Sequence, residues 1–299
     1  MNDTTLLEAE TRTTGNSMWA DFRAALPTFI KGTWSIAVYT WREGMRKKTL
    51  IGFLILSFLV IFGSFFITAF MTEAQVGNVG SDIDVKLIKD ISVTAITLFG
   101  VLITIFISAS VVPSEVENRV IYTILSKPVR RFQYLLGKFL GVQLIVILNL
   151  LLMGGLFFLA LWFKQRIVPT LLLWSILLTY FEFLIVSAFT FAISCAASSS
   201  VLPTIEGLFI YITGNLTEYL KDVQERVGET GNQWVGTLAR ALYEVLPNLQ
   251  RFSLKTQILY LQPNDPPKDL MLPNLVLYAL LFAASGFILG YWIFRRREL

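Results

Sequence analysis

Five long apolar runs divide this chain, and each is long enough to cross a lipid bilayer. A spanning helix needs roughly 20 predominantly apolar residues, because about 30 Å of hydrocarbon is crossed at 1.5 Å per residue. The five runs cover residues 51–71, 91–112, 139–163, 171–194 and 275–294. They predict five transmembrane helices.

A sixth, weaker run covers residues 201–220. Its wholly apolar part is short, and it contains Glu206 and Glu218. We count it as a span, because five spans would place the two ends of the chain on opposite sides, against the basic sequence FRRREL at the C-terminus. The predicted fold is therefore an all-α polytopic membrane protein with six transmembrane helices. Residues 1–30 form a cytoplasmic N-terminal segment, and 31–299 form the transmembrane domain, with a long outer loop at 221–273.

Lys and Arg residues predict the orientation, because cytoplasmic loops are enriched in them. Three clusters fall on one side of a six-span chain: Arg42, Arg46, Lys47 and Lys48; Arg119, Lys127, Arg130, Arg131 and Lys138; Arg295, Arg296 and Arg297. Lys164 and Arg166 are exceptions on the other side, but they do not outweigh three clusters. Both termini are therefore expected in the cytoplasm of a cell whose inner (plasma) membrane holds the protein.

Composition agrees with a membrane protein and excludes several other classes. Of 299 residues, 55% are hydrophobic and only 15% are charged, and the mean hydropathy is +0.63. There is no His and one Cys, Cys195, so a disulfide within the chain is excluded and a metal site built from these residues is not expected. The acidic start of the chain does not resemble a secretory signal. The net charge of +4 is small and lies beside apolar runs, so we expect no nucleic-acid partner.

An amphipathic segment, KGTWSIAVYTWREGMRKK at 31–48, precedes the first span. One predicted helical face carries Trp34, Val38, Trp41 and Met45. The polar positions beside it are Arg42, Glu43, Arg46, Lys47 and Lys48. Such a helix lies in the headgroup plane of the membrane and contacts lipid. It serves either as an anchor alone or as an element that transmits motion.

A second short helix is predicted in the loop 113–138, which lies between the second and third spans. Ser114 and Glu117 have the spacing of a capping box, which starts a helix. An apolar face follows at Val120, Ile121, Ile124 and Leu125. Lys127-Pro128 ends the helix, because the residue before a proline avoids helical angles. A solvated basic loop is the simpler interpretation, but it does not explain a capped, amphipathic helix.

This loop, VVPSEVENRVIYTILSKPVRRFQYLLGK, resembles the cytoplasmic loop of ABC type-2 transporter permeases. In that family an acidic helix start is followed by lysine-proline, arginine and glycine-lysine at the entry to the third span. TWREGMRKKTL before the first span, LPNLQRFSL before the last and the terminal RRREL also resemble the family. The resemblance implies an exporter permease that dimerises with an identical or a different permease subunit and docks on two ATP-binding subunits. The implied coupling helix covers Ser114–Leu125, with Glu115, Glu117, Arg119, Val120 and Ile121 as contact residues.

The absence of a P-loop motif agrees with a separate ATP-binding subunit. A phosphate-binding P-loop needs GxxxxGK[ST]. The only Gly-Lys pair is Gly137-Lys138, with Phe139 after it and Phe132 where the first glycine should stand. We therefore expect no enzyme activity and no cofactor in this chain, and ATP and magnesium in the partner subunit.

Two carboxylates lie in apolar surroundings. A charge at mid-bilayer is costly, so Glu182 is expected to face the bundle interior. It is either a transport-path or proton-carrying group, or a hydrogen-bonding partner of Asn149 or a Thr. Glu206 is expected to snorkel. The spacings Gly137-x-x-x-Gly141 and Gly286-x-x-x-Gly290 allow close helix approach, more often within a chain than between chains.

Three other functions remain as alternatives. A secondary carrier would use Glu182, but such carriers often show internal repeats, and none is found. An intramembrane enzyme is opposed by the lack of His and of Ser-Lys or paired-Asp arrangements in the spans. The last is a structural component of a membrane complex.

Overall fold

The computed structural model describes residues 29–74, 80–118, 130–165, 170–217, 246–253 and 272–297. The regular structure in this part of the chain is helical throughout. A first helix covers residues 29–45 and is called the N-terminal helix here. The later elements are α2 (Lys48–Ala74), α3 (Gly80–Ser110), α4 (Pro113–Glu117), α6 (Arg131–Gln165), α7 (Thr170–Ala196), α8 (Val201–Asn215), a 3-10 turn η1 (Gln250–Phe252) and α12 (Leu272–Arg296).

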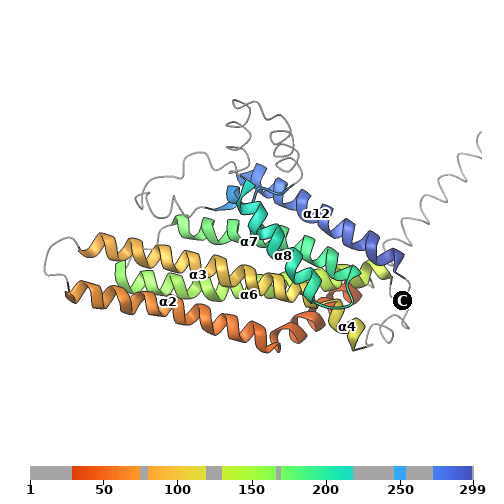
Figure 1. The fold of residues 1–299 in the computed structure, drawn as a ribbon, viewed down its shortest axis with the longest axis horizontal. Helices are drawn as coiled ribbons and strands as arrows, with labels where there is room; N and C mark the ends of the chain where they lie inside the picture. Colours follow the sequence, from red (N-terminus) through yellow and green to blue (C-terminus); the bar gives the residue numbers. More distant parts are fainter. Residues whose placement is uncertain are drawn as a thin grey trace, which may run out of the picture.

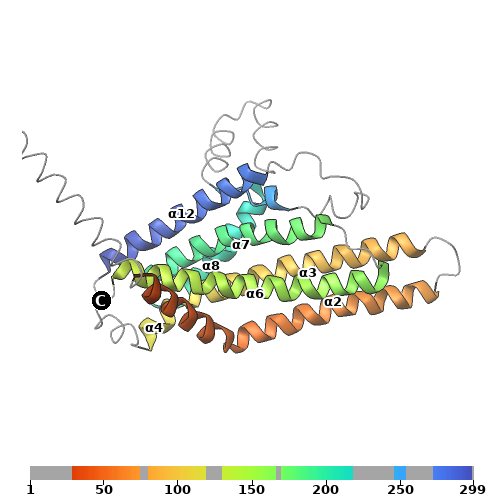
Figure 2. The same ribbon diagram turned by 180° about the vertical axis from the view of Figure 1, so that it is seen from behind.

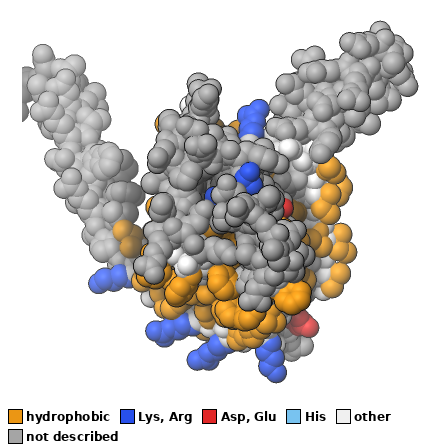
Figure 3. Space-filling view, turned by 90° about the vertical axis from the view of Figure 1, so that its left-hand side faces the viewer, with side chains coloured by type: hydrophobic (Ala, Val, Ile, Leu, Met, Phe, Trp, Pro, Cys, Tyr) orange, Lys and Arg blue, Asp and Glu red, His pale blue; other side chains and the backbone are white. Residues whose placement is uncertain are grey.

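Five described helices are long and apolar enough to cross a membrane, as the five strong runs predict. They are α2, α3, α6, α7 and α12, and they lie side by side in an elongated bundle (Figure 1). Two-thirds of the apolar window of α3 and of α7 is buried inside the protein, against 22% for α2 and for α12. Helices α3 and α7 therefore form the centre of the bundle, and α2 and α12 lie at its periphery. Figure 3, which views the bundle from the left-hand end of Figure 1, shows hydrophobic side chains in the lower half and at the right edge, as expected for lipid-facing sides.

The described members of the three basic clusters gather at one end of the bundle, called the basic end here. Lys47 donates to Ser110 Oγ at the end of α3, and Arg131 at the start of α6 donates to the carbonyl oxygen of Arg295. Arg297 donates to the carbonyl oxygen of Cys195 at the end of α7. The described members of the three clusters therefore share one end of the bundle, as predicted, whereas Arg119 and Lys127 lie outside the described residues.

Small residues bring helices into close contact inside the chain. A Cβ on Gly137 would lie 2.8 Å from the Thr33 carbonyl oxygen, and one on Gly141 would lie 2.8 Å from that of Ala37. The N-terminal helix therefore crosses directly against the first turns of α6 (Figure 2). Gly286 and Gly290 of α12 pack in the same way on Ala188 and Ala192 of α7. Both glycine pairs mediate contacts within the chain, as predicted.

The weak sixth run is only partly accounted for. Its described helix, α8, has 15 residues, about 22 Å at 1.5 Å per residue, which is short of the hydrocarbon thickness. Residues 218–245 and 254–271 lie outside the described part, so most of the outer loop does too. The short segment 246–253 packs back onto the bundle: Leu249 N–H donates to the Gly214 carbonyl oxygen, and Asn248 N–H donates to the Tyr278 hydroxyl.

Candidate functional site

Helix α4 directly follows α3, where the sequence predicts a new helix, but its start differs from the prediction. Val112 occupies the N-cap without a side-chain hydrogen bond, and Pro113 takes the first helical position. Proline is tolerated there because its missing N–H is not needed. Ser114 lies inside the helix, and its Oγ has no partner among the described residues. The predicted capping box is therefore wrong. Arg119, Val120, Ile121 and Leu125 lie outside the described residues.

The two acidic residues of α4 have different environments. Glu117 is exposed, as expected for a residue at the protein surface. Glu115 is only 3% exposed, and it accepts hydrogen bonds from the Tyr134 hydroxyl and from Lys138 Nζ of α6. Both residues are implied contacts of the coupling helix, but the Glu115 carboxylate is held inside the protein by two donors.

Lys138 is the buried centre of an ionic cluster. Its side chain is 0% exposed, and its Nζ pairs with Glu115 and lies 3.9 Å from Glu43 Oε2. The same Nζ lies over the rings of Tyr39 and Tyr134, at 5.3 and 5.9 Å from their centroids. A buried charge is tolerated when it is paired and hydrogen-bonded. Tyr39, Glu43, Glu115, Tyr134 and Lys138 are called the Lys138 cluster below.

The Lys138 cluster joins three elements that are separate in sequence. Tyr39 and Glu43 come from the N-terminal helix, Glu115 comes from α4, and Tyr134 and Lys138 come from α6. Burial raises the pKa of the Tyr39 hydroxyl, and the charges of Glu43 and Glu115 raise it further. Tyr39 therefore stays neutral at physiological pH. The N-terminal helix and α4 belong to the two segments that are expected to transmit motion. Both are thus bound to Lys138.

Sequence reasoning placed Lys138 among the basic residues that orient the chain and missed its role. One signal was present: Tyr134 and Lys138 are four residues apart, so they share a face at the start of a span. That this face is polar and points inward becomes evident only when the positions of its carboxylate partners are known. Those partners lie 23 and 95 residues earlier in the sequence.

The face of the N-terminal helix that packs on α6 is not the apolar face expected to contact lipid. Its buried face carries the small residues Thr33, Ala37, Thr40 and Gly44. Trp34 is 55% exposed, whereas Trp41 packs partly against the core. Arg42 and Arg46 are exposed. The predicted apolar face is therefore split between the core and the surface.

Glu182 and Glu206 lie apart from the Lys138 cluster. Glu182 of α7 is buried, as predicted, and lies near Asn215 of α8, whose Nδ2 donates to the Tyr211 carbonyl oxygen. The predicted partner Asn149 instead donates to the Ile145 carbonyl oxygen. Glu206 of α8 is half-buried, and its Oε2 has no hydrogen-bond partner among the described residues.

Comparison with known proteins places these features in a family. A family model described as ABC-2 family transporter protein matches residues 34–216, which is more than half of the chain. The match begins in the N-terminal helix and ends just after α8, so it includes the whole Lys138 cluster. No curated protein matches the chain. The extent of the family match shows that the chain belongs to the ABC-2 family of transporter proteins.

Proposed function

We propose that this protein is the permease subunit of an ATP-driven exporter, which forms the translocation path as a dimer and is driven by two copies of a separate ATP-binding subunit. Membership of the ABC-2 family supports a permease of this type. The observation that carries the proposal is the bond between α4 and the rest of the basic end through Glu115. A partner that moves α4 would move the N-terminal helix and α6 with it.

The environment of the only Gly-Lys pair supports a separate ATPase. Gly137 packs against Thr33 and Ile36 of the N-terminal helix, and Lys138 is fully buried with two carboxylates. Neither residue is free to cradle a phosphate. ATP and magnesium would accordingly bind the partner subunit, and this chain would supply the path and the docking surface.

The helix directions favour six crossings. Helices α7 and α12 run parallel, since Gly286 meets Ala188 and Gly290 meets Ala192, and both helices end at the basic end. Helix α8 begins near that end, directly after α7. The chain must therefore return to the opposite end before α12 starts, and a span that begins with α8 would do this. By the positive-inside rule the basic end and both termini would be cytoplasmic.

Motion would pass through the Lys138 cluster because separating its residues has a high free-energy cost. Removing one partner of a buried ion pair costs about 3–5 kcal/mol, since the remaining charge is left uncompensated. A push on α4 that stays below this cost moves the joined elements as one unit. The Tyr134 ring also stacks on Phe294 of α12, with centroids 5.8 Å apart, so the last helix is included.

Affinity purification of the tagged full chain from its own cells tests the proposal. A P-loop ATPase should copurify in equal amount with the permease, and the complex should hydrolyse ATP after reconstitution into vesicles. Purification of an intact dimer with no ATPase would contradict the proposed function and favour a carrier or a structural component.

A further inference from the structure

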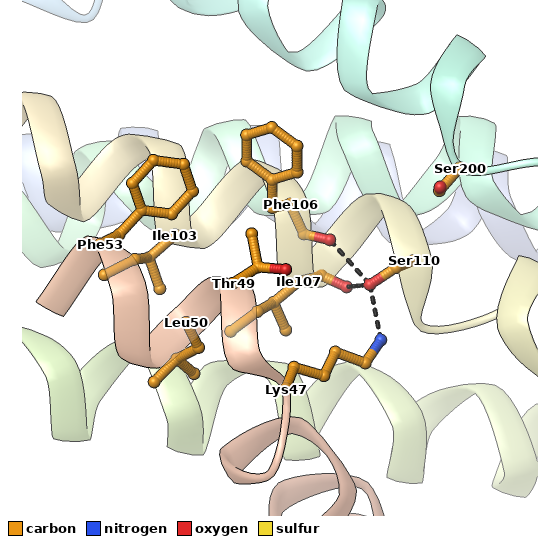
Figure 4. A pocket seen from close by; sticks show the side chains of 9 residues that line it. All are labelled: Lys47, Thr49, Leu50, Phe53, Ile103, Phe106, Ile107, Ser110 and Ser200. Carbon is orange, nitrogen blue, oxygen red and sulfur yellow. Dashed lines mark hydrogen bonds between the residues drawn. The ribbon is translucent and has the colours of Figure 1, made fainter.

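A pocket of about 160 Å³ opens where three helices meet at the basic end. It lies beside the last turns of α3, between the start of α2 and the start of α8 (Figure 4). Helices α2 and α8 both pack on α3, so the pocket fills the space between them. Its lining residues are Lys47, Thr49, Leu50, Phe53, Ile103, Phe106, Ile107, Ser110 and Ser200.

The pocket has a polar half and an apolar half. Lys47, Thr49, Ser110 and Ser200 supply one ammonium and three hydroxyl groups at the helix ends. Phe53 and Ile103 lie one to two turns deeper along α2 and α3. Figure 4 shows Lys47 pointing toward Ser110, with Phe53 and Ile103 on the other side of the pocket. The polar half of the pocket lies at the membrane boundary and the apolar half lies deeper, because Lys48 is the first residue of the apolar window of α2.

Lys47 is a half-buried cation that has no carboxylate within ion-pair distance in the described part of the chain. Both ion pairs found there are made by Lys138. The Lys47 ammonium donates one hydrogen bond, 2.7 Å long, to Ser110 Oγ. Ser110 in turn donates to the Phe106 carbonyl oxygen. An ammonium has three donors, so two remain for a ligand.

Electrostatics also favour an anion at Lys47. Burial lowers the pKa of Lys47, and the charges of Glu43 and Glu115 oppose that shift. Glu43 and Glu115 are both shared with Lys138, which acts on Lys47 as a like charge. An anion in the pocket would return to Lys47 the stabilisation that burial removes. The exposed Arg42, Arg46 and Lys48 add a positive field at the same level.

We propose that this pocket binds the phosphate headgroup of an anionic phospholipid from the leaflet at the basic end, with the first part of one acyl chain against Phe53 and Phe106. Basic pockets between spans and basic clusters beside a span attract such lipids. A pocket of about 160 Å³ suits a headgroup phosphate and not a whole lipid. A soluble phosphate would leave the apolar half unfilled. The lipid would bridge α2 and α8, and this proposal does not depend on the ATPase.

Thermal unfolding of the purified dimer in nonionic detergent tests the site. The probes are phosphatidylglycerol, phosphatidylcholine with the same acyl chains, and soluble glycerol phosphate. Phosphatidylglycerol should raise the unfolding midpoint with the highest apparent affinity, because only it supplies both an anionic headgroup and a chain. Equal effects of phosphatidylcholine would overturn the anion assignment. Equal effects of glycerol phosphate would overturn the lipid assignment.

A matched pair of variants separates the pocket from the general surface charge. Lys47→Met should weaken the apparent affinity for phosphatidylglycerol by about tenfold, since a buried charge-assisted contact is lost. Lys48→Met removes the same charge from the exposed neighbouring position and should weaken the affinity by only about twofold to threefold. Equal losses in the two variants would overturn the proposal.

Ser200→Leu keeps every charge and fills the polar half of the pocket. It should abolish the preference for phosphatidylglycerol, and it serves as the test if Lys47→Met does not fold. A Ser200→Leu protein that keeps the wild-type preference would also overturn the proposal.

Discussion

Lys138 Nζ of α6 lies 3.9 Å from Glu43 Oε2 of the N-terminal helix, and the same nitrogen is bonded to Glu115 of α4. One buried lysine thus holds together two segments that approach the bundle from different parts of the chain. The Tyr134 hydroxyl also donates to Glu115, so the carboxylate of α4 has two donors from α6. The arrangement makes the stability of this end depend on a single positive charge.

Lys138→Met should destabilise the protein strongly, by about 3–5 kcal/mol, because two carboxylates lose their common partner. The thermal unfolding midpoint of the purified protein measures this. The double variant Lys138→Met with Glu115→Gln should be more stable than Lys138→Met alone, since no buried carboxylate is left on α4. Additive losses in the double variant would show that the pair does not interact as the structure indicates.

Gly141→Ala should also lower stability, because the added Cβ would lie 2.5 Å from Thr40 Cβ and 2.8 Å from the Ala37 carbonyl oxygen. Forcing the N-terminal helix away from α6 in this way costs about 1–3 kcal/mol. Gly155→Ala is the matched control on the same helix, because no atom lies within 4 Å of a Cβ there. Equal unfolding midpoints for the two variants would argue against the close helix crossing.

The spans and the basic end were predictable because they depend on local sequence. Apolar runs fix where a helix can cross, and Lys and Arg mark which helix ends belong together. The described bounds of α7, Thr170–Ala196, differ by at most two residues from the predicted run 171–194. The span predicted at 201–220 remains a prediction, since α8 ends at Asn215 after 15 residues.

The Lys138 cluster was not predictable because it depends on how distant elements pack. Glu115 and Glu117 look alike in sequence, yet one is buried and the other is exposed. The N-terminal helix shows the same limit of pattern reasoning. Hydrophobicity selects the face of Trp34 and Trp41, whereas close approach to Gly137 and Gly141 selects the face of Thr33 and Ala37. Packing distance decided the outcome, and it is not visible in a single sequence.

Topology gives a further prediction. Cysteines introduced at Arg46 and Arg295 should be protected from an impermeant thiol reagent in intact cells, and one at Gln233 should react, if the basic end is cytoplasmic. Cys195→Ser provides the background, and the buried Cys195 is expected to contribute little label in any case. Labelling at position 295 without labelling at position 233 would contradict six crossings.

Glu182 should act as a packing group. Glu182→Gln keeps a hydrogen-bonding side chain next to Asn215, so folding, transport and their pH response should remain close to wild type. Glu182→Leu should cost about 1–3 kcal/mol, because leucine differs from glutamate in shape and cannot hydrogen-bond at this buried position. A changed pH response of transport in Glu182→Gln, with normal folding, would instead support a role for this carboxylate in the transport path.

Glu115→Gln should uncouple the permease from its ATPase. Glutamine has nearly the same shape as glutamate and can still contact Tyr134 and Lys138, so the dimer should assemble and the ATPase should copurify. The loss of charge weakens the bond between α4 and α6, and losing roughly 1.4 kcal/mol corresponds to a tenfold change. Transport per ATP hydrolysed should therefore fall by about tenfold in vesicles. Glu117→Gln removes the same charge from the exposed position of the same helix and should change this ratio far less. Normal transport by Glu115→Gln would show that motion does not pass through the Lys138 cluster. The double variant Val120→Ser with Ile121→Ser then tests the following segment. Loss of the ATPase from that variant would place docking in 119–125.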